Sequence, residues 1–288
     1  MYEIQGLLTK YDASYVRDGL ASVEAVNKFA ATFYRDVAEF YDCITRVKNV
    51  ERNPTGYSLL DAPVLGLLVR SWKLLKEVIR YYEENNGELV GILERPLLEA
   101  VIVAQYLMAN DESVIADYRR CSYKDRLRIL RDLQQGSPFL ETKAGKRLVA
   151  SVLEKLSFEG LTEESFEVQK RNRWKLQGKT FRDIFSAVEH DALYPSSYGM
   201  MSESIHGSWN DSMDYGLIRL DDGTFSTNPF FQPADIRYVT PLLRFTTPAY
   251  RMWLHRIGAE DAGLPRVLDW ADSVNAALYS RFDELYGI

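Results

Sequence analysis

The chain has 288 residues, of which 46% are hydrophobic and 26% are charged, and its formal net charge is −6. This composition excludes an intrinsically disordered chain and is typical of a globular protein with a sizeable core. The negative charge argues against strong non-specific binding of nucleic acid, which needs a net basic surface. The 18 tyrosines predict polar contacts inside helix interfaces, because a tyrosine packs and hydrogen-bonds at once.

Several targeting and cofactor signals are missing from the sequence. The start, MYEIQGLLTKYDASY, lacks the charged and then apolar pattern of a signal peptide. No run of about 18 apolar residues predicts a membrane span. Cys43 and Cys121 match no metal spacing and are predicted to be free core thiols. We expect a cytoplasmic protein with no membrane contact, no metal and no cofactor, since phosphate-loop and dinucleotide motifs are absent too.

Residues 14–49 predict one long helix, because apolar side chains from Val16 to Val47 recur every three or four positions. Asn53 and Pro54 end it. We favour packing of this helix within the chain, and a homodimer formed through it stays open.

The middle of the chain predicts a series of helices with Gly, Asn and Pro between them. The expected ranges are 62–86, 88–110, 112–135, 142–156, 163–175, 180–189 and 195–210. The part from 96 to 109 is apolar on all sides except at Glu99 and Gln105, which predicts a central helix.

The last third of the chain changes character and then returns to helix. Alternating apolar and polar residues around Asp221-Asp222-Gly223 predict a β-hairpin near 215–228. Helices follow at 234–258, interrupted or kinked near Pro241 and Pro248, and at 265–286. The predicted fold class is all-α, a multi-helix bundle with a small β-hairpin insertion, in a single domain over 1–288.

Two polar constellations interrupt the apolar helices. Tyr198, Ser202 and His206 are spaced by four, so they share one face of a helix. Arg95 and Glu99 are also four apart, and we expect them to form a buried ion pair, because an unpaired carboxylate in so apolar a helix is costly. Such a pair often only fixes helix register, so a structural role stays open for both groups.

The segments ERPLLEAVIVAQYLM (94–108) and LYPSSYGMMSESIHGSW (193–209) resemble the two signature segments of the prokaryotic domain-of-unknown-function family 5677. In that family an Arg-x3-Glu helix precedes a Tyr-x3-Ser-x3-His helix. The resemblance covers roughly residues 60–215, without the first helix and the 215–288 tail. It implies a helical fold and a site made of those five residues, but no activity. Members look like accessory or defence proteins of bacteria, which is association and not mechanism.

Basic residues gather in two further places, from Arg119 to Arg131 and around Trp174, from Lys170 to Lys179. We interpret both as solvated faces, and binding of RNA or a phosphorylated ligand there stays an alternative. Arg251 and His255 are too closely spaced for the Arg–His motif of HEPN-type ribonucleases.

The sequence leaves open whether the protein is an enzyme. The first hypothesis is a non-catalytic interaction or accessory protein, in which the five polar residues lock helices together. The alternative is a metal-independent nuclease or phosphoester-cleaving effector. In it His206 is the acid or base and Arg95 stabilises negative charge. Glu99 orients Arg95, and Tyr198 or Ser202 positions the substrate. The two hypotheses divide on whether His206 reaches Arg95 or Glu99 at an open site.

Overall fold

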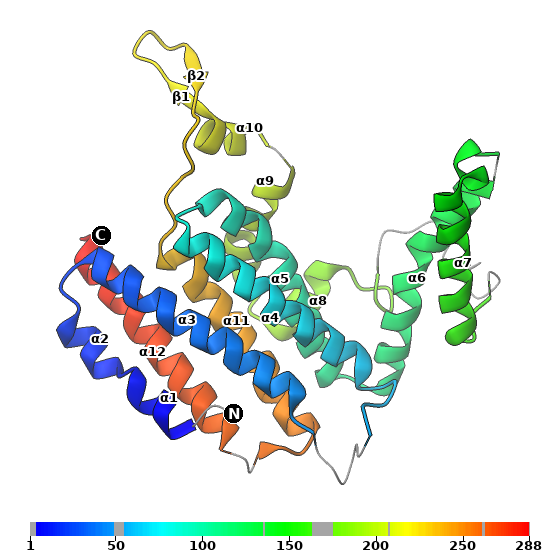
Figure 1. The fold of residues 1–288 in the computed structure, drawn as a ribbon, viewed down its shortest axis with the longest axis horizontal. Coiled ribbons are helices and arrows are strands. Elements are labelled where there is room, and N and C mark those ends of the chain that lie inside the picture. Colours follow the sequence, from blue (N-terminus) through cyan, green and yellow to red (C-terminus); the bar gives the residue numbers. More distant parts are fainter. Residues whose placement is uncertain are drawn as a thin grey trace. The chain divides into compact units, whose positions relative to one another are not determined.

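The computed structural model describes residues 4–48, 55–134, 136–162, 175–206, 208–260 and 263–287. It confirms the all-α fold class with a small β-hairpin (Figure 1). The chain divides into two compact units, Met1–Ala109 with Phe185–Ile288, and Asn110–Ile184. The single domain over 1–288 stays a prediction.

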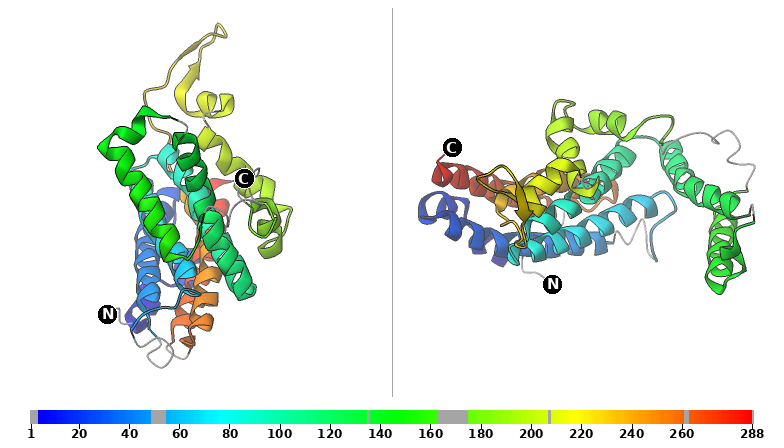
Figure 2. Two further views of the ribbon diagram at one scale, coloured as in Figure 1. Left: turned by 90° about the vertical axis from the view of Figure 1, so that its right-hand side faces the viewer. Right: turned by 90° about the horizontal axis from the view of Figure 1, so that it is seen from above.

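The larger unit is a helix bundle. Its helices α5 and α11 pack against each other, α4 packs on α5 and α3, and α12 packs on α11, α3 and α2. Figure 2 shows α3, α11 and α12 running side by side. The bounds are α1 Ile4–Lys10, α2 Ala13–Gly19, α3 Val23–Arg46, α4 Ala62–Glu83, α5 Gly87–Ala109, α11 Ile236–Arg256 and α12 Leu264–Tyr286.

The apolar helix α5 is central to this bundle, as predicted. Nearly every residue from Leu97 to Leu107 is buried, and Gln105 donates from Nε2 to the carbonyl of Phe245 at 3.1 Å. α5 continues through Pro96, and α11 continues through Pro241 and Pro248, so neither helix is interrupted.

The predicted helix over 14–49 is two helices, α2 and α3. The chain is extended at Leu20, and Ser22 Oγ accepts a hydrogen bond from the backbone N–H of Ala25 at 3.1 Å, which starts α3. Val16, Leu20 and Val26 are all buried, so the apolar stripe continues across the break between the two helices. The periodicity alone therefore predicts one helix instead of two.

The tyrosines form the polar contacts that their number predicted. Tyr34 donates to Asn275 Oδ1 at 3.1 Å and shares a 3.0 Å bond with Thr240. Tyr41 and Tyr250 stack with ring centroids 4.0 Å apart and an interplanar angle of 7°. Burial raises the pKa of all three phenols, so they stay neutral donors inside the bundle.

The smaller unit contains α6 Glu112–Gln134, a short 3₁₀ helix Pro138–Glu141, α7 Lys143–Phe158 and the first turn of α8 Phe181–Val188. Cys121 donates to the carbonyl of Lys175 at 2.9 Å, and Cys43 and Cys121 are free thiols, as predicted. The predicted helix 163–175 lies outside the described residues up to 174, and at 175 the chain is not helical.

The basic groups of the smaller unit are only partly described. Arg119 is not on a solvated face: it forms an ion pair with Glu159, and the side chains are 20% and 9% exposed. The side chains of 124–134 and the residues 163–174 lie outside the description, so binding of RNA or a phosphorylated ligand there stays a prediction.

The hairpin lies where the sequence placed it. β1 Leu217–Arg219 pairs antiparallel with β2 Phe225–Thr227, and Leu217 faces Thr227 (Figure 1). Gly223 in the turn has a φ of 82°, which favours glycine. Among the described helices, none combines the length and apolarity needed to cross a membrane.

Candidate functional site

The helix predicted over 195–210 consists of three consecutive pieces. Residues Pro195–Gly199 form a π-helical turn, α9 covers Met200–His206, and α10 covers Trp209–Asp211. Ser208 begins α10, since its Oγ accepts from the backbone N–H of Asp211 at 3.0 Å. The predicted stripe therefore runs from the π turn to the last residue of α9, and α9 packs on α5.

The guanidinium of Arg95 joins the two polar constellations. Its Nε donates to Glu99 Oε1 at 3.1 Å, and its Nη2 donates to the Tyr198 hydroxyl at 2.5 Å. Its Nη1 lies 3.2 Å from His206 Nε2. Four of the five predicted residues thus meet in one hydrogen-bonded cluster, which we call the Arg95 cluster.

Tyr198 holds the guanidinium in two ways. Its ring lies under Arg95, with the guanidinium carbon 4.6 Å from the ring centroid, and its hydroxyl donates to Glu99 Oε1 at 2.8 Å. Burial, and then the bond to Glu99, raises the pKa of Tyr198, so the phenol stays protonated. It can therefore donate to Glu99 while it accepts from Arg95.

Ser202 lies beside the cluster but does not contact the other side chains through a hydrogen bond that the structure describes. Its Oγ donates to the backbone carbonyl of Tyr198 at 2.6 Å, one turn earlier. This bond ties the start of α9 to the π turn, which is a local backbone role.

The Arg95–Glu99 pair is not buried, contrary to the prediction. The side chains of Arg95 and Glu99 are 20% and 41% exposed, and His206 is exposed. The neighbours of Glu99 along α5, Leu98 and Ala100, are buried, whereas Glu99 itself reaches the surface. The Arg95 cluster is therefore open to solvent.

The contact between Arg95 and His206 indicates which tautomer a neutral imidazole adopts. A guanidinium only donates, so His206 Nε2 accepts and the proton of a neutral ring is on Nδ1. A guanidinium has five N–H groups, and its bonds to Glu99, Tyr198 and His206 leave donors without a partner among the described residues. An anion beside His206 can take these donors.

The comparisons with known proteins identify one family. The model of a family of unknown function, DUF5677, matches residues 61–225, more than half of the chain. The chain belongs to DUF5677. No curated protein and no solved structure matches it. The match runs from the start of α4 into β2 and includes all five residues of the predicted site, whereas α1 to α3, α11 and α12 lie outside it.

The DUF5677 segment also contains a carboxyl group that the sequence analysis missed. Burial raises the pKa of Glu94 to about 8. Burial raises the pKa values of Tyr215 and Tyr238, and the charge of Glu94 raises both further. A signal for it exists in the sequence: Glu94 is three or four residues from Val90, Gly91, Leu97 and Leu98, all of which are buried.

Glu94 predicts a loss of stability as the pH rises. A carboxyl whose pKa is raised in the folded state binds its proton more tightly there, so its contribution is present below about pH 4.5 and lost towards pH 8. We expect the free energy of unfolding to fall on the order of 2 kcal/mol more in wild type than in Glu94→Gln between pH 5 and 8. Urea unfolding at several pH values measures this. Glu24→Gln, at an exposed carboxylate, is the control. If the free energy of unfolding depends on pH in the same way in wild type and Glu94→Gln, the prediction is wrong.

The arrangement of possible metal ligands is the next feature of these side chains. Within the described ranges, no group of three or more His, Cys, Asp or Glu residues is arranged to hold an ion. The carboxylate of the Arg95 cluster already accepts from Arg95 and Tyr198 through Oε1.

Proposed function

We propose that the Arg95 cluster is the active site of a metal-independent phosphoester-cleaving enzyme of the nuclease class. The observation that carries this proposal is the 3.2 Å separation between Arg95 Nη1 and Nε2 of His206, an exposed residue. Arg95 is held on its other sides by Glu99 and Tyr198, so its charge is oriented before any substrate arrives.

The cluster divides the chemistry between two side chains. Arg95 binds the non-bridging oxygens of a phosphodiester and stabilises the charge that develops on them in the transition state. His206 Nε2 takes the proton of the attacking hydroxyl, and the same imidazole returns a proton to the leaving oxygen. Glu99 and Tyr198 act as positioning residues, because their contacts are to Arg95.

The resting hydrogen bond fits this division. In the structure, Arg95 Nη1 occupies the lone pair of His206 Nε2. A phosphate oxygen is a stronger acceptor than an imidazole, because it is ionised. Its arrival draws Arg95 towards the phosphate and frees Nε2 to act as a base.

Cleavage of labelled RNA, single-stranded DNA and a chromogenic phosphodiester tests the proposal, in the presence of EDTA. We expect wild type to cleave at least one of them and His206→Ala to be slower by about 100-fold or more. His255→Ala is the matched control, because His255 is 77% exposed and pairs with Glu260 away from the cluster. Equal rates for wild type and His206→Ala, or no cleavage above the buffer rate, would refute the assignment.

A non-catalytic accessory protein is the second candidate, and a specific observation favours it. Tyr198 bonds Arg95 and Glu99 of α5, and Ser202 bonds the π turn, so the same residues fasten α9 to α5. If this is their only role, wild type cleaves nothing, and Tyr198→Phe lowers the melting temperature. Roles in bacterial defence or in a homodimer through the first helices stay predictions.

A further inference from the structure

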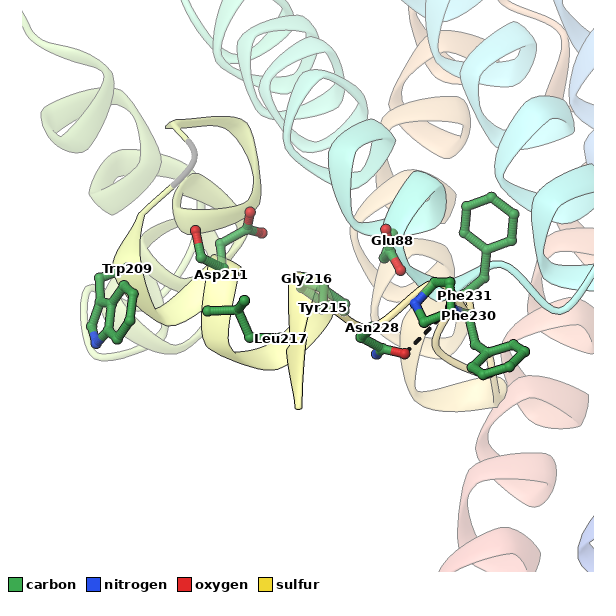
Figure 3. A pocket seen from close by; sticks show the side chains of 11 residues that line it. Glu88, Trp209, Asp211, Tyr215, Gly216, Leu217, Asn228, Phe230 and Phe231 are labelled. Carbon is green, nitrogen blue, oxygen red and sulfur yellow. Dashed lines mark hydrogen bonds between the residues drawn. The ribbon is translucent and has the colours of Figure 1, made fainter. Parts of the chain in front are cut away.

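A second site of the larger unit lies around the base of the hairpin, and it shares no residue with the Arg95 cluster. It is a cavity of about 580 Å³ lined by residues of the α5 start, α10, the turn into β1 and the segment before α11. Figure 3 shows Trp209 at one end of the cavity and Phe230 and Phe231 at the other, with Asp211 and Glu88 between them.

Two carboxylates line this cavity. Glu88 and Asp211 are both partly buried, and neither forms an ion pair or a side-chain hydrogen bond with any residue that the structure describes. A partly buried carboxylate is costly without a partner of opposite charge. Asp211 also acts on Tyr215 of the cavity wall: burial raises the pKa of this phenol, a hydrogen bond with Tyr238 lowers it, and the charges of Asp214, Asp211 and Glu94 raise it further.

The aromatic side chains extend the site beyond the cavity. Phe230, Phe231 and Trp209 are 74%, 65% and 63% exposed. Their faces attract cations, and aromatic side chains are the residues most enriched where proteins bind one another. Asn228 Oδ1 accepts from the backbone N–H of Phe230 at 3.3 Å, which fixes the turn that presents both phenylalanines (Figure 3).

We infer that this aromatic–carboxylate pocket binds an arginine- or lysine-bearing segment of a partner protein. A guanidinium or ammonium group enters between Glu88 and Asp211, and the aliphatic part of the segment covers Trp209, Phe230 and Phe231. The charge of the pocket selects the cation. The three exposed rings extend beyond the cavity. A peptide can cover them, whereas a small amine would leave most of their apolar surface in contact with water, so the pocket favours a peptide.

Fluorescence anisotropy with a labelled peptide of alternating arginine and leucine tests the inference on the full chain. Its partner peptide carries citrulline, which keeps the shape and removes the charge. We expect wild type to bind the arginine peptide about tenfold or more tightly than the citrulline peptide. The double variant Glu88→Gln/Asp211→Asn loses that difference, and Phe230→Ala/Phe231→Ala weakens binding of the arginine peptide by about tenfold.

The matched control is Glu24→Gln/Asp221→Asn, which changes the net charge equally at exposed carboxylates outside the pocket. It keeps wild-type binding if the pocket is the site. An equal loss in both double variants would reduce the effect to net charge and overturn the inference. So would a Kd weaker than about 1 mM for the arginine peptide. Binding of spermine as tightly as the peptide, or self-association that Phe230→Ala/Phe231→Ala abolishes, would assign the pocket to a different occupant.

Discussion

Replacing Tyr250 with alanine is expected to lower the free energy of unfolding by about 3–5 kcal/mol. Tyr250 on α11 is fully buried, and its ring stacks on Tyr41 of α3 at 4.0 Å. Its hydroxyl donates to the carbonyl of Leu68 at 2.9 Å and lies 2.8 Å from Ser71 Oγ, both on α4. One side chain thus joins three helices, and its removal leaves a cavity between them and deletes its hydrogen bonds to α4.

Urea unfolding followed by circular dichroism measures this loss, and two variants divide it into its parts. Tyr250→Phe keeps the ring and removes only the hydroxyl, so we expect a loss of about 1–3 kcal/mol. Tyr279→Ala removes a tyrosine of α12 that is 44% exposed and should cost less than about 1 kcal/mol. A loss for Tyr250→Ala no larger than that for Tyr279→Ala would contradict the central place of this contact.

The sequence predicts this bundle well because apolar periodicity reports directly on a helix face. It locates α4, α5, α6, α7, α11 and α12 to within a few residues, and the hairpin follows from alternation around a turn. Periodicity does not show where one helix ends and the next begins if the apolar stripe continues across the break. The stripe from Val16 to Val26 continues through the break at Leu20, and only the hydrogen bond made by Ser22 marks the new start.

The site was predictable in part. Spacing by four places Arg95 beside Glu99 on one helix, since that distance is local. Contact between Arg95 and Tyr198 crosses 103 positions of sequence, so it depends on how α9 packs on α5 and was expected only from the family resemblance. Exposure of Glu99 depends on the same packing, and the all-round apolar pattern of α5 suggested the wrong answer.

Glu94 illustrates the opposite failure. Periodicity places Glu94 among the buried positions of α5, but the prediction of a buried carboxylate was made for Glu99, which has Arg95 one turn away. Burial raises the pKa of a carboxyl, whereas a nearby cation lowers it. An acidic residue on the apolar face of a helix is therefore the better candidate for a raised pKa than one with a cation one turn away.

Replacing Arg95 with alanine should separate function from stability. The variant loses the bonds to Glu99, Tyr198 and His206 together, and with them the positive charge at the proposed phosphate site. We expect phosphoester cleavage to fall by about 1,000-fold. The free energy of unfolding should fall by only about 1 kcal/mol, because the Arg95–Glu99 pair is partly exposed and screened by water.

Arg95→Lys tests what the fork of the guanidinium contributes. A lysine keeps the charge but has one nitrogen, so it cannot reach Glu99, Tyr198 and His206 at once. If Arg95 holds the transition state, the lysine variant keeps near wild-type stability and still loses about 100-fold in rate. If Arg95 only fastens α9 to α5, the two variants differ in melting temperature and neither changes a rate. Thermal unfolding and cleavage assays on one set of samples decide between these outcomes, because each role moves a different quantity.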